Sequence, residues 1–269
     1  MIGGYFHQGS GLGNMLFRYI TVRSLALDKG YDFCMTYTPD GSGKTPGFKG
    51  DSFMDIQWKA PRPSSLDGFT SFEEKKVVVD GLDVRSYDPE INFVKDNTII
   101  DGEFQSDKYW GHHLDFINQW LKVEPLEVPD DTCVIGFRGG EYQVVSDLFL
   151  PNEYWEKSIA MMREINPKMK FEVHTDDINT ASKFFGYMGV KIIHDIGWNW
   201  RAMRYARHAI VANSSFYIIP RLLRHNDGDG VLTIAPKYWA RYNTKQWALP
   251  QNYYQQFEYI HHEGGSDKL

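Results

Sequence analysis

The sequence has little cysteine, no long apolar run and no excess of positive charge. Its two cysteines, Cys34 and Cys133, each lie within an apolar stretch. So few cysteines exclude a disulfide scaffold, and we expect two buried free thiols in a reducing compartment. No segment approaches the roughly 20 apolar residues of a membrane-spanning helix, and the first residues do not resemble a secretory signal. We therefore expect a cytoplasmic protein with no stable membrane insertion.

Charge and composition narrow the class of partner. The formal net charge is −6 at pH 7 and no basic stripe runs along the chain, which argues against a nucleic-acid partner. A few local cations can still hold a small anionic ligand. Hydrophobic residues at 42% and charged residues at 24% are typical of a folded globular protein. Aromatic residues, at 15%, suit either an aromatic-rich core or clefts that bind rings and sugars.

The second half of the chain alternates short apolar strands with amphipathic helices. We predict strands at 133–137, 170–175, 190–194, 209–213 and 231–235. Helices are expected from about 153, over 178–188 and 199–207, and from about 215. This alternation predicts a parallel sheet whose crossover helices cover both faces. We therefore assign residues 129–269 to one Rossmann-like domain, and we predict the interdomain linker around its start, at 126–131.

The first half is less regular, and we assign residues 1–128 to an N-terminal α/β domain. We expect strands at 31–37, 77–79 and 98–100 and a helix over 115–121. The Gly-, Pro- and Ser-rich stretches 39–50 and 61–68 are predicted to be loops that frame a cleft.

A glycine loop precedes the first predicted helix. Gly9, Gly11 and Gly13 occupy alternate positions and are followed by Asn14, a favourable N-cap, and by apolar residues at helical spacing up to Gly30. The backbone amides of such a loop can bind phosphate at the helix N-terminus. The same pattern also makes a plain tight turn.

Three polar clusters directly follow predicted strands, where open parallel sheets bind their ligands. Arg138 lies next to two glycines. Its guanidinium can bind a diphosphate through a bidentate contact, or it can form an ion pair at the surface. After the next strand, His174 is followed by Asp176 and Asp177, which can bind a ribose or a base edge, or can cap a helix. The third cluster offers hydroxyls and amides to the same anion, and consists of Asn213, Ser214, Ser215 and Phe216.

No metal site is expected. The pairs His112–His113 and His261–His262 are adjacent in sequence, so their side chains should point in different directions in regular structure. Asp227 and Asp229 have the acid-x-acid spacing of a divalent-cation site. They lie between a helix and a strand, however, and alternate with glycines, which predicts a turn.

Taken in order, four blocks of the chain resemble the α-1,2-fucosyltransferases of glycosyltransferase family 11. The family motif GGLGNQMFQYA is similar to residues 10–20, and DGYFQSEKYF is similar to residues 101–110. The signature HxRRxDY resembles residues 136–142, and the final block, NSSFSWW with IAPKxW, resembles residues 213–219 and 234–239. The blocks span nearly the whole chain.

The chain also departs from the family motifs. Gly136, Gly139 and Glu141 stand in place of the histidine, the second arginine and the aspartate of the signature, which leaves one arginine and one tyrosine unaltered. Two isoleucines replace the tryptophan pair, and Pro220 follows them, which predicts a helix that starts late or is kinked. These changes bear on the sugar and the acceptor more than on the fold or the nucleotide.

The resemblance implies the GT-B architecture, with two Rossmann-like domains facing across a cleft, and an enzyme that needs no metal or other cofactor. Residues 129–269 would bind the donor GDP-fucose. Residues 1–128 would hold the glycan acceptor, with the glycine loop closing over the diphosphate. The chain would be an inverting glycosyltransferase that moves fucose to an acceptor hydroxyl. The alternatives are a GT-B enzyme with another nucleotide-sugar, or a non-catalytic module that binds a nucleotide-sugar or a glycan.

The resemblance and the polar clusters together imply a site. Arg138 would stabilise the leaving diphosphate, and Glu141 would be either the catalytic base or a structural partner. The other residues expected to bind the donor are Gly11, Gly13, Asn14, His174, Asp176, Asp177, Asn213, Ser214, Ser215 and Phe216.

Overall fold

The computed structural model describes residues 1–7, 9–37, 47–56, 68–79, 82–145, 148–240 and 252–262. The chain divides into two compact units. Unit 1 comprises Met1–Val77 and Asp83–Val123, and unit 2 comprises Val78–Leu82 and Glu124–Leu269. The loops predicted at 39–50 and 61–68 fall largely outside the described residues.

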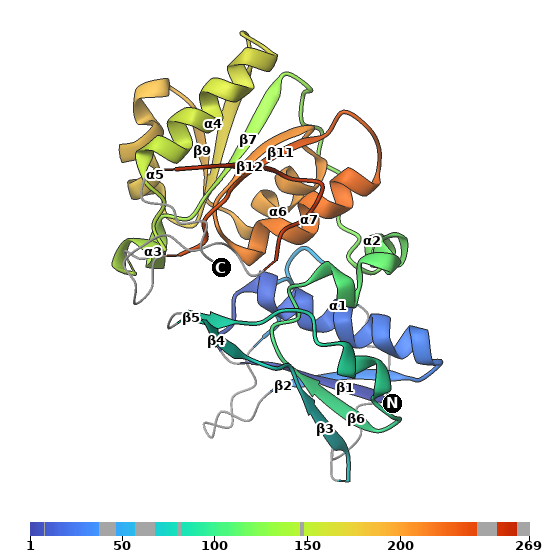
Figure 1. The fold of residues 1–269 in the computed structure, drawn as a ribbon. Coiled ribbons are helices and arrows are strands. Elements are labelled where there is room, and N and C mark those ends of the chain that lie inside the picture. The colour runs from blue at the N-terminus through green and yellow to red at the C-terminus, as the bar shows by residue number, and fades with distance from the viewer. Residues whose placement is uncertain are drawn as a thin grey trace. The chain divides into compact units, whose positions relative to one another are not determined.

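Unit 1 contains a four-stranded parallel sheet in the order β2-β1-β6-β3. Its strands are β1 (Ile2–Phe6), β2 (Phe33–Tyr37), β3 (Thr70–Glu73) and β6 (Thr98–Asp101). Helix α1 (Leu12–Lys29) packs against β1 and β2 (Figure 1). A glycine lets the helix approach β1 closely, because a Cβ on Gly4 would lie 2.5 Å from Cγ2 of Val22.

The start of α1 differs from the prediction. The helix begins at Leu12 with Gly11 as its N-cap, so Asn14 lies in the first turn and does not cap it. Leu12 is buried, and its burial extends the apolar face of the helix toward the glycine loop. The predicted C-terminus is confirmed, because Gly30 adopts a left-handed φ of 65° and its N–H reaches the last helix carbonyls.

The other elements around unit 1 are short. Strand β4 (Val77–Val79) pairs with β5 (Leu82–Val84) in a separate two-stranded sheet. The 3-10 turns are η1 (Pro89–Phe93), η2 (Asp107–Tyr109) and η3 (Gly111–His113), and the last leads into α2 (Leu114–Trp120). The predicted strands at 31–37, 77–79 and 98–100 and the helix at 115–121 are confirmed.

Unit 2 contains a six-stranded parallel sheet in the order β12-β11-β10-β7-β8-β9. The strands are β7 (Thr132–Phe137), β8 (Lys170–Thr175), β9 (Lys191–Ile193), β10 (His208–Val211), β11 (Leu232–Pro236) and β12 (Glu258–Ile260). The five strands predicted for this half are confirmed. The sixth, β12, is an edge strand that the sequence did not indicate.

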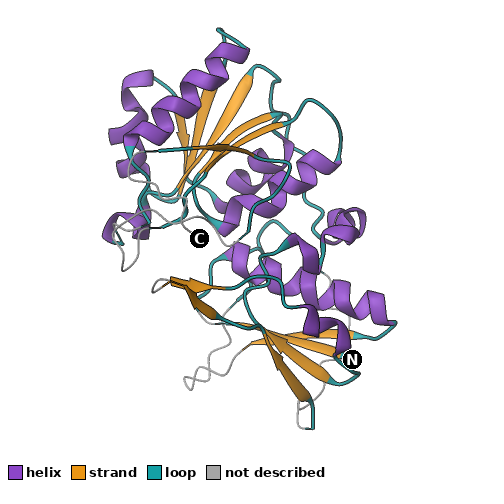
Figure 2. Ribbon diagram, in the orientation of Figure 1, coloured by secondary structure: helices purple, strands orange, loops and turns teal. Residues whose placement is uncertain are grey.

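Helices cover both faces of this sheet, α4 and α5 on one side and α6 and α7 on the other (Figure 2). The helical segments are α3 (Gly140–Val144), α4 (Asn152–Ile165), α5 (Ile178–Phe185) with the 3-10 turn η4 (Gly186–Met188), α6 (Ile196–Tyr205) and α7 (Ser215–Asn226). Helix α6 begins earlier than predicted because Asp195 caps it. Helix α7 does not start late, and Pro220 lies inside it.

Each sheet has one place where the direction of strand succession reverses. In unit 1, the chain passes from β1 outward to β2, while β6 lies on the other side of β1. In unit 2, β7 is followed outward by β8 and β9, and β10 by β11 and β12 on the opposite side. Open α/β sheets bind ligands at such switch points, outside the carboxyl ends of the strands. A site is therefore expected at the carboxyl ends of β1 and β6, or at those of β7 and β10.

Both cysteines are buried free thiols, as predicted. Burial raises the pKa of each thiol, so neither is a ready nucleophile. Within the described parts of the chain, no helix has the length and apolar character needed to cross a membrane.

Candidate functional site

Gly136, near the end of β7, and Gly139, in the loop after it, leave no room for side chains. A Cβ on Gly136 would lie 2.7 Å from the ring of Tyr217, so this ring fills the space beside the strand end. A Cβ on Gly139 would lie 2.8 Å from the ring of Phe137. The histidine and second arginine of the family signature are thus replaced where larger side chains would collide with the present packing.

Arg138 lies in this loop between two carboxylates. Its Nη1 is 2.7 Å from Oδ2 of Asp176, and its Nη2 donates a hydrogen bond of 2.6 Å to Oε1 of Glu141. The guanidinium also lies over the ring of Tyr142, 5.0 Å from its centroid. Burial alone would lower the pKa of Arg138, but the charge of Asp176, with smaller effects of Tyr217 and other neighbours, outweighs burial and raises it. Arg138 is therefore a fixed, permanent positive charge at the end of β7.

One atom of Arg138 is left without a partner. Its Nε is buried and has no hydrogen-bond partner among the described residues. An unsatisfied buried donor is uncommon in native structures, and it is the kind of group that a bound anion can satisfy. The Arg138 side chain as a whole is 23% exposed, so a solute can reach the guanidinium although Nε itself is buried.

Asp176 holds the loop as well as the arginine. Its Oδ1 accepts hydrogen bonds from the backbone N–H of Gly139, at 2.8 Å, and of Gly140, at 3.1 Å.

Asp177 has a different structural role. Its carboxylate caps α5, accepting from Asn179 N at 2.9 Å and from the Thr180 hydroxyl at 2.7 Å, and these bonds, that from Thr180 first, lower its pKa. Of the two roles considered for Asp177, capping is the one seen.

His174 lies in the interior of unit 2. Its side chain is fully buried, and Nδ1 is 3.0 Å from Oδ1 of Asn199. Asn199 in turn donates to the backbone carbonyl of Thr175, at the end of β8. His174 therefore supports the strand end from inside and presents no atom at the surface.

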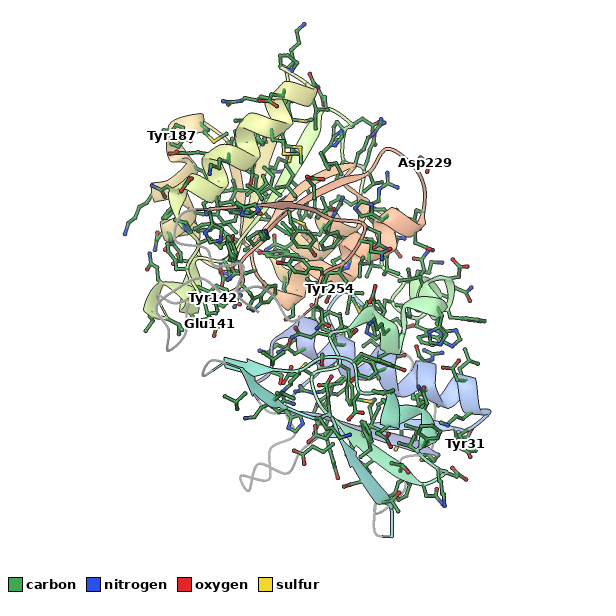
Figure 3. All side chains as sticks on the ribbon, in the orientation of Figure 1. Tyr31, Glu141, Tyr142, Tyr187, Asp229 and Tyr254 are labelled. Carbon is green, nitrogen blue, oxygen red and sulfur yellow. The ribbon has the colours of Figure 1, made fainter. Side chains whose placement is uncertain are left out.

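The loop after β10 lies directly beside the Arg138 loop, because β10 and β7 are paired with Val211 opposite Gly136. Asn213 is fully buried and its amide donates to the carbonyls of Leu148, at 2.9 Å, and Trp239, at 2.5 Å. The hydroxyl of Tyr142 donates to the carbonyl of Asn213, at 3.2 Å, and so links the two loops. Figure 3 shows Tyr142 and Glu141 side by side on this edge of unit 2.

Helix α7 begins at the same edge. Ser214 is its N-cap, and Ser215 is its first residue. Phe216 packs against the ring of Trp200, with centroids 5.7 Å apart. The N-terminus of a helix attracts anions through its free amides and its dipole. Arg138 and the start of α7 thus place positive potential at the switch point of the unit 2 sheet.

The glycine-loop residues belong to unit 1. Gly11 is exposed and has open space where a Cβ would be, and Gly13 and Asn14 lie in the first turn of α1. Gly9 has a φ of 78°, which favours glycine. The Oδ1 of Asn14 accepts a hydrogen bond of 3.4 Å from Gln105. The predicted site residues therefore fall into two groups, one at the switch point of each sheet, with His174 buried.

Unit 1 has a pocket that was not expected from the sequence. It has a volume of about 330 Å³ and is lined by His7, Ser10, Arg18, Glu73, Arg85, Asp101, Gly102 and Glu103. Arg18 is buried, and it donates to the Gly102 carbonyl at 2.7 Å and to Oε1 of Glu103 at 2.8 Å. Burial lowers the pKa of Arg18, and Glu103 partly offsets this effect. The sequence feature that could have indicated this pocket is the presence of Asp101 and Glu103 directly after the strand predicted at 98–100.

The wall of this pocket is held by a buried carboxylate. Glu74 accepts hydrogen bonds from the backbone N–H of Glu103, at 2.7 Å, and of Phe104, at 3.1 Å. Phe104 has a φ of 49°, which is rare for a bulky residue and is compensated by these bonds. Gly102 passes close by, because a Cβ there would lie 2.5 Å from Cβ of Glu74.

The expectation about adjacent histidines is wrong for one pair. His112 and His113 both face Asp28, with Nε2–Oδ2 and Nε2–Oδ1 distances of 2.9 Å and 2.6 Å. The 3-10 turn η3 brings the two rings to the same side. These three residues offer ligand atoms within 4.8 Å of one another and could hold a metal ion.

The predicted turn around Asp227 is confirmed. Residues 227–230 lie between α7 and β11, and Asp227 forms an ion pair with Arg204. Asp229 is exposed at the end of unit 2 away from Glu141 and Tyr142 (Figure 3). This turn precedes the amino end of β11, so it lies away from the carboxyl ends where a donor would bind.

Comparisons with known proteins identify the fold. No protein-family model matches the sequence, and no curated protein matches it. A structure of POFUT1 in complex with GDP-fucose is similar to it, with 8% identity and a TM-score of 0.50 over 87% of this chain and 96% of that chain. The iron-containing dodecameric glycosyltransferase TibC from enterotoxigenic E. coli has 10% identity and a TM-score of 0.50 over 94% of this chain and 62% of that chain. The fucosyltransferase NodZ from Bradyrhizobium is a looser likeness, with 12% identity and a TM-score of 0.45 over 82% of this chain and 93% of that chain.

At identities this low, the likeness concerns the fold alone. The chain has the α/β fold of GT-B glycosyltransferases, with a parallel sheet in each of two units. The GT-B α/β fold that the resemblance implied, with a Rossmann-like parallel sheet in each unit, is therefore confirmed.

Proposed function

We propose that the chain is an inverting glycosyltransferase that moves fucose from GDP-fucose to a hydroxyl of a glycan acceptor. The observation that carries the proposal is the position of Arg138, fixed by Asp176 at the switch point of the unit 2 sheet and next to the N-terminus of α7. The four ordered motif blocks supply the choice of fucose and GDP. The GT-B fold is compatible with both.

In this proposal, Arg138 stabilises the leaving diphosphate. When the bond between the anomeric carbon and the diphosphate breaks, negative charge grows on the phosphate oxygens. A preorganised guanidinium acts on that charge more strongly in the transition state than in the ground state. Because Glu141 is 71% exposed and Asp176 only 28%, we expect the diphosphate to replace Glu141 on the guanidinium while Asp176 stays.

The remaining donor residues are proposed to act in two ways. Direct contacts with the donor are proposed for the start of α7 (Ser214, Ser215 and Phe216), and for Gly11, Gly13 and Asn14 at the start of α1. Indirect roles are proposed for the residues that brace the loops, namely His174, Asp176, Asp177 and Asn213. The pocket of unit 1, with lining groups of both signs that suit a hydroxyl-rich ligand, is proposed to take the glycan.

Two roles for Glu141 were left open by the sequence. Its ion pair to Arg138 and its exposure support the role of a partner that keeps the empty guanidinium oriented. A base works best when it is removed from water and free of a cationic partner. The role of base is tested separately below.

Binding of nucleotides tests the donor assignment at low cost. A ligand present at a hundredfold excess over its Kd stabilises the folded state by about 2.7 kcal/mol. We expect GDP to raise the unfolding temperature more than UDP or CDP, and Arg138→Ala to abolish most of that rise. Arg207→Ala is the matched control, because Arg207 is an ion-paired arginine at the amino end of β10. Equal shifts with all three nucleotides would contradict the choice of GDP.

A non-catalytic binding module is the second candidate. The altered signature favours it, since Tyr217 and Phe137 occupy the space beside Gly136 and Gly139 where the family has histidine and arginine. Transfer of labelled fucose to a glycan array separates the two candidates. Binding of GDP without donor hydrolysis or transfer would support the module, and transfer from another nucleotide-sugar would support a GT-B enzyme with a different donor.

A further inference from the structure

A histidine and an aspartate meet at the switch point of the unit 1 sheet. His7 directly follows β1, and Asp101 is the last residue of β6. These strands are parallel neighbours, with Gly4 opposite Ile100, so both side chains come from carboxyl ends on the same edge. Both residues also line the pocket of unit 1.

The contact with Asp101 favours one tautomer of the neutral His7 ring. Nε2 of His7 is 2.6 Å from Oδ1 of Asp101. With the Asp101 carboxylate as acceptor, Nε2 carries the hydrogen of the neutral ring and Nδ1 carries the lone pair. Nδ1 has no hydrogen-bond partner among the described residues. The His7 side chain is 32% exposed and therefore reachable by a ligand.

The charged groups that line the pocket with His7 do not pair with its Nδ1 in the described part of the chain. Arg18 is bound by Glu103 and the Gly102 carbonyl, so its charge is engaged on the pocket wall. The other charged groups around the pocket are Asp101, Glu73 and Arg85, and the ring of Tyr5 meets that of His7 edge-on at 6.4 Å. A histidine oriented by a carboxylate, with its second nitrogen open to a pocket, is the arrangement used for proton removal near neutral pH.

We propose that His7 is the general base of the reaction and that Asp101 is its positioning residue; this inference rests on the proposed glycosyltransferase function. The acceptor hydroxyl gives its proton to Nδ1 of His7 as its oxygen forms a bond to the anomeric carbon of the nucleotide-sugar. The bond between that carbon and the diphosphate breaks, and its electron pair leaves with the diphosphate. Asp101 keeps the ring in the reactive tautomer and stabilises the imidazolium that forms.

The test compares His7→Gln with a matched control. Loss of a positioned base typically lowers turnover 10²–10⁴-fold. We expect His7→Gln to lower kcat by that factor while the Kd for GDP stays unchanged, since the change removes none of the groups proposed to contact the donor. His112→Gln removes another His–Asp pair of unit 1 that lies outside the pocket, and kcat should stay within about twofold, the usual size of a silent surface change.

Two further readouts separate a base from a structural residue. Wild-type kcat/KM should fall toward acid pH, because a protonated imidazole accepts no proton, and this acid limb should be absent from the residual activity of His7→Gln. Added imidazole should restore part of the activity of His7→Ala. Asp101→Asn should lower kcat less than His7→Gln and should displace the acid limb.

The outcomes distinguish the two proposals. A wild-type protein that neither binds GDP nor transfers any sugar overturns the proposed function, and the base assignment with it. A wild-type protein that transfers sugar while folded His7→Gln keeps its kcat and its acid limb overturns the base assignment alone. A 10²-fold or larger loss with intact GDP binding and imidazole rescue establishes it.

Discussion

Asp176 and Arg138 form an ion pair of 2.7 Å that ties the end of β8 to the loop after β7. The same carboxylate also binds the backbone N–H of Gly139 and Gly140. One aspartate thus fixes both the charge of the arginine and the path of the loop that carries it. A guanidinium held in this way needs little reorganisation when a diphosphate arrives, which is the condition for strong electrostatic stabilisation of a leaving group.

Arg138→Ala should reduce turnover severely. Loss of one preorganised donor typically costs 10²–10³-fold in kcat, and the chain has no second arginine at position 139. Because Oδ2 of Asp176 loses its ion-pair partner while Oδ1 keeps the N–H groups of Gly139 and Gly140, we also expect a loss of stability of about 1 kcal/mol. Measured kcat, together with unfolding curves, checks both effects. Arg138→Lys should recover little turnover, since a point charge does not reproduce the two-pronged contact. A folded Arg138→Ala protein with near wild-type turnover and GDP affinity would place the diphosphate elsewhere.

Glu141→Gln separates the two roles of this residue. If Glu141 only orients the empty guanidinium, the amide keeps a hydrogen bond to Arg138 and kcat should change by less than about fivefold, well below the 10²-fold that loss of a base produces. GDP should bind slightly more tightly, because a competing charge is gone. Steady-state kinetics and GDP titration measure the two quantities. A loss of 10²-fold or more in kcat, with GDP binding intact, would identify Glu141 as the base.

The sequence predicted unit 2 better than unit 1 for a physical reason. Strands such as β7 and β10 are apolar runs because both faces of a parallel sheet are covered. Strand β1 has the same environment, but Gly3 and Gly4 interrupt its apolar run, so no strand was predicted there. Strand β12 has three residues and lies at the sheet edge, where no apolar run is required.

The site was predicted where it depends on local sequence and missed where it depends on tertiary pairing. Arg138 was identified because it directly follows a strand and stands beside glycines. His7 and Asp101 are 94 positions apart, and only the pairing of β1 with β6 brings them together. The prediction that the side chains of His112 and His113 point in different directions was wrong for a related reason. Both residues lie in a 3-10 turn, where adjacent side chains can converge on Asp28 in a way that a regular helix or strand does not allow.

Turnover should not depend on a divalent cation. Arg138 and the start of α7 supply positive charge to the diphosphate, and Asp227 is already paired with Arg204. We expect activity to persist in excess EDTA and Asp229→Ala to be nearly silent. His112→Gln removes one of the three residues that could hold an ion, and it should also leave activity unchanged. Loss of turnover in EDTA that Mn²⁺ restores would contradict this prediction.

The last prediction concerns His225 on α7 and the stability of unit 2 in acid. Its Nε2 lies 2.9 Å from the hydroxyl of Thr233, which also accepts a hydrogen bond from Arg221. The hydroxyl hydrogen is therefore available to His225, and this bond favours a neutral ring. Burial lowers the pKa of His225 from 6.5 to about 4, and the positive charges of Arg221 and Arg224 add to the effect.

The sign of the pH effect follows from these values. Between pH 6.5 and 4 the unfolded chain binds a proton at His225 that the folded chain does not, so acid favours unfolding in this window. His225→Gln keeps an acceptor for the Thr233 hydroxyl but has no charge to bury. We expect its unfolding temperature to fall less than that of wild type when the pH is lowered from 7 to about 4.5, well inside the range set by the two pKa values. His194→Gln, at an exposed histidine, should follow the wild type. Identical acid sensitivity of His225→Gln and wild type would show that His225 is not held neutral.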